Sequence, residues 1–121
     1  MIIGPDIPML PHQLKRLAKH ASIGIGSSGS PGENDSGDIF LAFSTANEMS
    51  VLQKEVPILN MKFTNDQQFD PIYEKTCHAI DEAIINAMIA ADSMSALKPS
   101  GEIVEAVDHE QLMEVMKKYN R

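Results

Sequence analysis

The amino-acid sequence predicts an α/β fold, and three observations support this prediction. A continuous apolar run, Ile39 to Phe43, lies between polar breakers and is typical of a strand buried on both faces. From Leu59 to Phe63, apolar and polar residues alternate, as they do in a half-buried strand. Two longer segments, about Pro11–Ile25 and Pro71–Met94, repeat apolar residues at helical spacing. The pattern indicates a sheet with helices packed on it.

Length and composition limit the classes of protein that the chain can represent. Its 121 residues fit a single domain, residues 1–121, and 43% hydrophobic residues are ordinary for a globular protein. A net charge of −7 argues against nucleic acid or an anionic membrane as a partner. Cys77 is the single cysteine, which fits a cytoplasmic location. We expect no signal peptide and no membrane span, because long apolar runs are absent.

The first elements follow from local signals. Met1 to Ile3 resembles the end of a strand, which the turn residues Gly4 and Pro5 stop. Pro11 suits the first turn of the helix Pro11–Ile25. The run Gly24–Gly29 matches the pattern G-x-G-x-x-G, but its glycines close a helix instead of opening one, so a phosphate site is a weak interpretation.

A polar loop from Ser27 to Asp35 leads into the strand Asp38–Thr45. The next strand, Val56–Thr64, follows after a polar connection. Two strands in succession predict an antiparallel pair within a larger sheet.

The second half of the chain is mainly helical. Asp70 and Pro71 start a helix whose wide apolar stripe predicts cover on more than one side. Cys77 borders that stripe as a small hydrophobe, and His78 faces away from it. A turn at Lys98–Gly101, a short strand or extended arm at Ile103–Val107 and a helix capped by Asp108 complete the chain.

Candidate chemistry concentrates at the entrance of the buried strand. Ser36, Gly37 and Asp38 place a hydroxyl and a carboxylate beside that strand, although the same residues also suit an ordinary turn. The four histidines show no metal-ligand spacing, and neither H-E-x-x-H nor G-x-S-x-G is present. We therefore expect no metal and no cofactor.

Two blocks of sequence carry a resemblance to a known family. The block Pro11-His12-Gln13-Leu14-Lys15-Arg16-Leu17-Ala18 precedes Ser36-Gly37-Asp38-Ile39-Phe40-Leu41-Ala42-Phe43-Ser44-Thr45-Ala46-Asn47. Together they resemble the D-aminopeptidase and β-peptidyl aminopeptidase group, peptidase family S58. The resemblance implies part of an αββα sandwich and a precursor that cleaves itself before a serine. That serine then begins the smaller, C-terminal subunit as its nucleophile.

The resemblance also implies roles for particular residues. Ser36 and Asp38 match the family's supporting pair, which orients the nucleophile and its amine. By the same register, the nucleophile serine would lie just upstream of Met1. That serine is not in this sequence, so we expect the chain alone to be inactive. Gly4 and Pro5 depart from the apolar strand of the family pattern.

The implied partners are a larger N-terminal subunit of the same precursor and a peptide, amide or ester substrate. We also expect a homo-oligomer, because an exposed strand edge favours self-association. Two alternatives remain open at this point. One is an acyltransferase of the ornithine acetyltransferase type, and the other is a non-catalytic remnant that assembles with itself.

Overall fold

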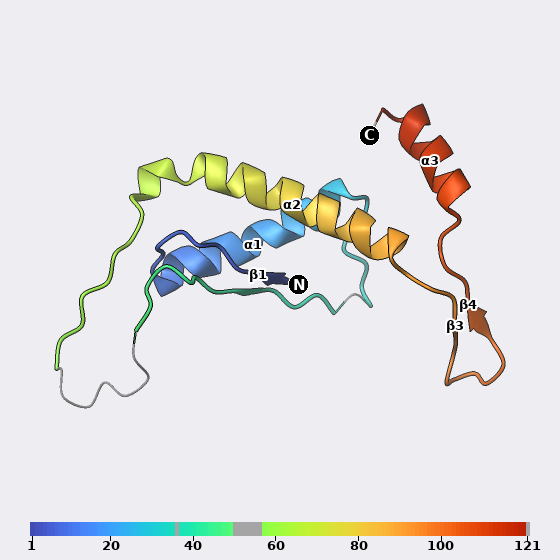
Figure 1. The fold of residues 1–121 in the computed structure, drawn as a ribbon, viewed down its shortest axis with the longest axis horizontal. Coiled ribbons are helices and arrows are strands. Elements are labelled where there is room, and N and C mark those ends of the chain that lie inside the picture. Colours follow the sequence, from blue (N-terminus) through green and yellow to red (C-terminus); the bar gives the residue numbers. More distant parts are fainter. Residues whose placement is uncertain (36, 50–56, 121) are drawn as a thin grey trace. The chain divides into compact units, whose positions relative to one another are not determined.

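The computed structural model describes residues 1–35, 37–49 and 57–120, and these form two compact units, Met1–Asp81 and Glu82–Arg121 (Figure 1). Helix α2 (Asp70–Ile89) begins in the first unit and ends in the second. The first unit also contains β1 (Ile2–Ile3), α1 (Pro11–Ser27), β2 (Leu41–Ala42) and a 3-10 turn, η1 (Asp66–Gln68). The second contains β3 (Met94–Ser95), β4 (Ile103–Val104) and α3 (His109–Lys118).

Strands β1 and β2 pair in parallel, with Ile2 opposite Leu41. Three backbone N–H groups of the second segment donate to carbonyls of the first: Leu41 to Met1 at 3.0 Å, Phe43 to Ile3 at 3.0 Å and Thr45 to Pro5 at 3.2 Å. Pro5 has no N–H group to donate in return, which explains why the regular ladder stops there. The strand expected at Met1–Ile3 is confirmed. The strand expected over Asp38–Thr45 is regular only at Leu41–Ala42.

The expected antiparallel pair of Asp38–Thr45 with Val56–Thr64 is wrong. The neighbour of β2 is β1, and residues 57–64 are extended but belong to no strand, while Val56 lies outside the described residues. The side-chain amide of Asn47 takes the place of a neighbouring strand. Its Oδ1 accepts from the Lys62 N–H and its Nδ2 donates to the Lys62 carbonyl, both at 3.0 Å. An alternating sequence needs a backbone partner to become a strand, and the described residues supply none there.

The core of the first unit lies on one face of the β1–β2 pair. Met9, Leu17 and Phe69 are buried, and a ring of half-buried side chains packs around them: Ile3, Ile7, Leu14, Ile72 and Tyr73. Because side chains alternate along a strand, the opposite face carries Ile2, Ile39, Leu41 and Phe43. We call these four residues the open sheet face.

The open sheet face is uncovered among the described residues. Its side chains are 70%, 80%, 55% and 46% exposed, in the order given. The expectation of a strand buried on both faces is therefore wrong within this chain, where only one face is covered. The sequence pattern is that of a sheet with two covered faces, and the cover of the second face is not among the residues described.

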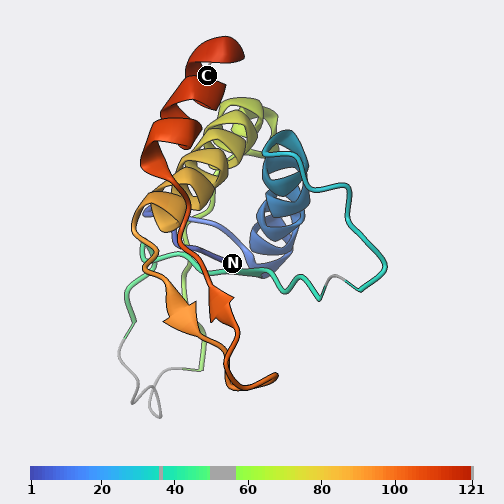
Figure 2. The same ribbon diagram turned by 90° about the vertical axis from the view of Figure 1, so that its right-hand side faces the viewer.

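Helices α1 and α2 lie side by side and run in the same direction (Figures 1 and 2). The His20 ring stacks on Tyr73 with centroids 3.8 Å apart. One turn further on, Gly24 packs against α2 so closely that a Cβ atom there would lie 2.8 Å from Ile80 Cγ2. The helix predicted to end near Ile25 continues to Ser27, and Gly29 follows at a φ of +109°. Gly24 and Gly26, which were predicted to end the helix, therefore lie inside it, and Gly29 is the glycine that follows its end.

A buried polar residue, Gln13, ties α1 to the segment before α2. Its side chain is 1% exposed, and its Oε1 accepts from the Leu10 N–H at 2.9 Å. Its Nε2 donates to the Thr64 carbonyl at 2.8 Å and to Asp66 Oδ1 at 2.6 Å. Arg16 lies 3.3 Å from the other carboxylate oxygen of Asp66. The start of α1 is fixed by these contacts.

The second unit differs from expectation at the end of α2. The helix predicted to reach Met94 ends at Ile89, and Met94 instead pairs with Val104 in the antiparallel β3–β4 hairpin (Figure 2). Ser93 contributes to this break because its Oγ accepts from the Ala106 N–H at 2.9 Å, and serine competes for backbone groups in this way. The turn at Lys98–Gly101 is confirmed.

Two further expectations about the second half of the chain can be compared with the structure. The Asp108 cap is confirmed, since its Oδ1 accepts from the N–H groups of Glu110 at 2.8 Å and Gln111 at 3.1 Å. The expected cover of α2 on more than one side is wrong for the described part of the chain, where Ile80 is the buried residue of that helix. His78 is exposed, as predicted, whereas Cys77, which was predicted to be a small buried hydrophobe, is only half-buried.

The close approach of the two helices leads to a first prediction. Gly24→Ala should lower the free energy of unfolding by about 1 to 3 kcal/mol, because the new methyl group would overpack against Ile80. Gly26→Ala is the matched control in the same helix. Nothing lies within 4 Å of the Cβ position of residue 26, so this variant should raise the free energy of unfolding by up to about 1 kcal/mol. Urea denaturation followed by circular dichroism measures both. Equal stability of the two variants would contradict the close packing.

The contacts of Gln13 lead to a second prediction. Gln13→Leu should lower the free energy of unfolding by about 1 to 3 kcal/mol, since it leaves the partly buried Leu10 N–H and Thr64 carbonyl without this partner. Lys15→Leu, on the exposed side of the same helix, should change stability by less than about 0.5 kcal/mol. Thermal unfolding of the two variants tests the difference.

Candidate active site

The predicted site residues lie at the entrance of β2, and the structure describes one of the two. Ser36 lies outside the described residues, so its position stays a prediction. Asp38 is exposed and immediately precedes Ile39, whose carbonyl accepts a hydrogen bond from the Met1 amino group at 2.7 Å. Asp38 is therefore the residue directly before Ile39, where the segment leading into β2 contacts Met1.

The register of β1 and β2 shows which residues of the two segments lie opposite one another near Asp38. Ile2 lies opposite Leu41 and Ile3 lies opposite Ala42, which places Met1 opposite Phe40. Because the strands are parallel, backbone that continues the first strand in front of Met1 would run past Ile39 and then Asp38.

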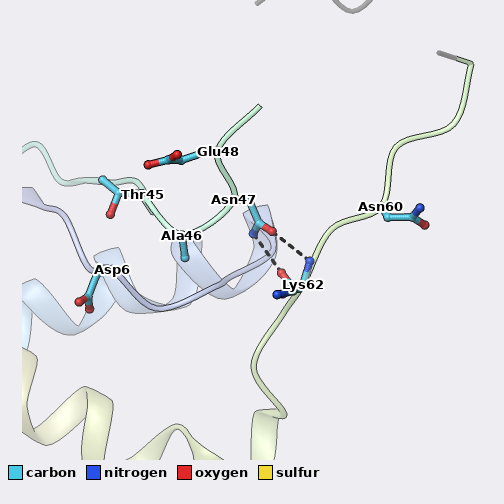
Figure 3. A pocket seen from close by; sticks show the side chains of 7 residues that line it. All are labelled: Asp6, Thr45, Ala46, Asn47, Glu48, Asn60 and Lys62. Atoms are coloured by element: carbon cyan, nitrogen blue, oxygen red, sulfur yellow. Dashed lines mark hydrogen bonds between the residues drawn. The ribbon is translucent and has the colours of Figure 1, made fainter. Parts of the chain in front are cut away.

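A polar cavity of about 550 Å³ lies at the other end of the strand pair, where both strands finish (Figure 3). Asp6 follows β1, and Thr45, Ala46, Asn47 and Glu48 follow β2; Asn60 and Lys62 complete the lining. The paired hydrogen bonds between Asn47 and the Lys62 backbone close one side. The sequence reasoning missed these residues. Their signal was the presence of polar side chains just after two apolar strands, because carboxyl ends of parallel strands often border ligand sites.

Other groups with catalytic potential are engaged in structural contacts. His20 stacks on Tyr73, and His109 Nε2 lies 3.1 Å from the Ile89 carbonyl oxygen. Within residues 1–35, 37–49 and 57–120, the structure places no three histidine, cysteine, aspartate or glutamate side chains together as a metal site would require. No helix in that part of the chain has both the length and the apolar surface needed to span a membrane.

Comparisons with known proteins place these observations in context. The family model described as Peptidase family S58 matches residues 1–101. The chain is 40% identical over 121 residues to the beta-peptidyl aminopeptidase BapA of Sphingosinicella microcystinivorans, covering 100% of this chain and 30% of that protein. It is 30% identical over 117 residues to BapA of Sphingosinicella xenopeptidilytica, covering 97% of this chain and 29% of that protein.

Solved structures give the same picture for the fold. The l-aminopeptidase d-ala-esterase/amidase of Ochrobactrum anthropi, described as a variant of the Ntn hydrolase fold, is 46% identical. It superposes with a TM-score of 0.86 over 99% of this chain and 34% of that chain. A protein from Pyrococcus horikoshii follows with 36% identity and a TM-score of 0.81 over 96% of this chain and 32% of that chain. A beta-aminopeptidase from a Burkholderia species has 32% identity and a TM-score of 0.80, covering 97% of this chain and 34% of that chain.

These values confirm the predicted α/β class as part of a larger Ntn-hydrolase fold. The chain spans about a third of the length of the relatives that it matches: 30% and 29% of the two curated proteins. The family model nevertheless extends over residues 1–101, which include β1, α1, β2 and all of α2. The chain therefore belongs to peptidase family S58.

Proposed function

We propose that this chain belongs to the smaller, C-terminal part of an aminopeptidase that releases N-terminal residues from peptides, amides or esters, and that the nucleophile serine of this enzyme lies in front of Met1. The observation that carries the proposal is the parallel register of β1 and β2. A strand that continued β1 in front of Met1 would run past Asp38, the residue to which the family resemblance gives a supporting role for a serine nucleophile. Names of relatives with 40% and 46% identity point to the same class of reaction.

In the proposed reaction, a serine in front of Met1 attacks the carbonyl carbon of the substrate. The free α-amine of that serine takes the hydroxyl proton and passes it to the leaving amine or alcohol. The acyl group is then transferred from the serine oxygen to water, which regenerates the hydroxyl. Asp38, three residues before β2, would orient the serine amine through its negative charge, and the family resemblance gives Ser36 a supporting role in polarising the nucleophile.

The proposed partner is the larger N-terminal subunit of the same precursor. This chain accounts for 34% of the length of the Ochrobactrum anthropi protein, so most of such an enzyme lies outside it. The open sheet face supports the proposal independently, since large apolar side chains that gather on one face of a sheet mark a surface that another layer covers.

The role of Asp38 can be tested in the assembled enzyme. Asp38→Asn should lower kcat for an aminoacyl p-nitroanilide by about 10² to 10⁴-fold, the usual contribution of a positioned acid or base. Asp35→Asn, an exposed carboxylate in the same loop, is the control and should retain activity. Release of p-nitroaniline at 405 nm is the measurement. Full activity of Asp38→Asn in an enzyme that still assembles would refute the role.

The dependence on the missing nucleophile can be tested with the 121-residue chain itself. The purified chain should release no p-nitroaniline, because the proposed serine and the larger subunit are absent from it. Measurable release that disappears in Ser36→Ala would show instead that the chain carries its own nucleophile.

A further inference from the structure

The segment from Leu59 to Phe63 has two chemically different faces. Asn60 and Lys62 line the polar cavity (Figure 3). Leu59, Met61 and Phe63 alternate with them and are 47%, 42% and 59% exposed. Alternation of this kind is the pattern of a strand that buries one face, and among the described residues no layer covers the apolar one. We call Leu59, Met61 and Phe63 the apolar edge.

The backbone that carries the apolar edge is held in place at its end. The Asn47 amide binds both the N–H and the carbonyl of Lys62 at 3.0 Å. Two residues further on, the Thr64 N–H and Oγ1 both donate to the Pro8 carbonyl at 2.9 Å. Groups fixed before association lose little conformational entropy when a partner binds them, so this segment is prepared for docking.

The length of chain beyond these residues indicates what covers the apolar edge. The superposition on the Ochrobactrum anthropi structure includes 99% of this chain but 34% of that one. A chain of similar fold therefore holds the equivalent of this segment beside about twice as many further residues. The occupant that fits is the remainder of the same precursor, which supplies apolar surface without a second binding event.

We propose that the apolar edge docks against the larger subunit of the precursor, while the polar face of the same segment lines the cavity. The inference rests on the proposed function, which supplies the partner, and it names a contact surface outside the catalytic end of the strands. Met61 is the middle residue of the edge, so its replacement by a charged residue should weaken docking most directly.

The test uses the larger subunit encoded with this chain, co-expressed with a tagged wild-type chain or with one of two variants. Met61→Glu places a negative charge on the apolar edge. Asn60→Glu adds the same charge one residue away, on the polar face, and is the matched control. We expect Met61→Glu to reduce the amount of larger subunit retained on the tag by at least tenfold, and Asn60→Glu to retain it as the wild type does. Circular dichroism melting of the isolated variants should be unchanged, since both side chains are exposed.

Retention of the larger subunit by Met61→Glu at the wild-type level would overturn the inference. So would equal loss in both variants, or failure of the wild-type chain to retain the subunit. Hydrolysis by the wild-type pair is scored separately, which distinguishes the two proposals. A wild-type pair that assembles through Met61 but hydrolyses nothing would leave the docking surface standing and refute the aminopeptidase function.

Discussion

The parallel backbone pairing of the first residues with the segment after Asp38 is the constraint on which the rest of the first unit depends. It brings together segments about forty positions apart in the sequence, and it does so through backbone groups that any residue could supply. The side chains decide which register forms, because a shift by one residue would turn Ile3 from the core to the open sheet face. The same register fixes what lies beside Asp38. Structure and proposed chemistry therefore rest on one set of hydrogen bonds.

Two contacts on the helical side hold that pairing in place. Gln13 connects the start of α1 with the segment in front of α2, and Gly24 lets the two helices approach closely one side-chain layer above the core. Since α1 joins β1 to β2, the position of α1 limits where both strands can lie.

Local signals predicted the elements that depend on local chemistry. Pro11 marked the start of α1 and Asp108 marked the start of α3, because caps and turns are formed by neighbours in sequence, whereas α1 continues through Gly24 and Gly26 to Ser27. The strand pairing was not predictable in this way. The pattern of Leu59–Phe63 indicates a strand but not its partner, and Met94 was assigned to a helix because nothing local shows that Val104 will lie opposite. Asp38 was found from its position before an apolar run, whereas its relation to Met1 required the parallel register.

The open sheet face has a consequence for how such a chain is kept soluble. A bare apolar sheet with unpaired backbone at its edge is a template for aggregation, and the large apolar side chains of the open sheet face are exposed among the described residues. If the cover is made as part of the same polypeptide, it arrives in equal amount and at high local concentration, before any other chain can add to the edge. In this view, the proposed synthesis from one precursor would serve quality control as well as catalysis, because the cover would reach the hydrophobic sheet before a neighbouring molecule does.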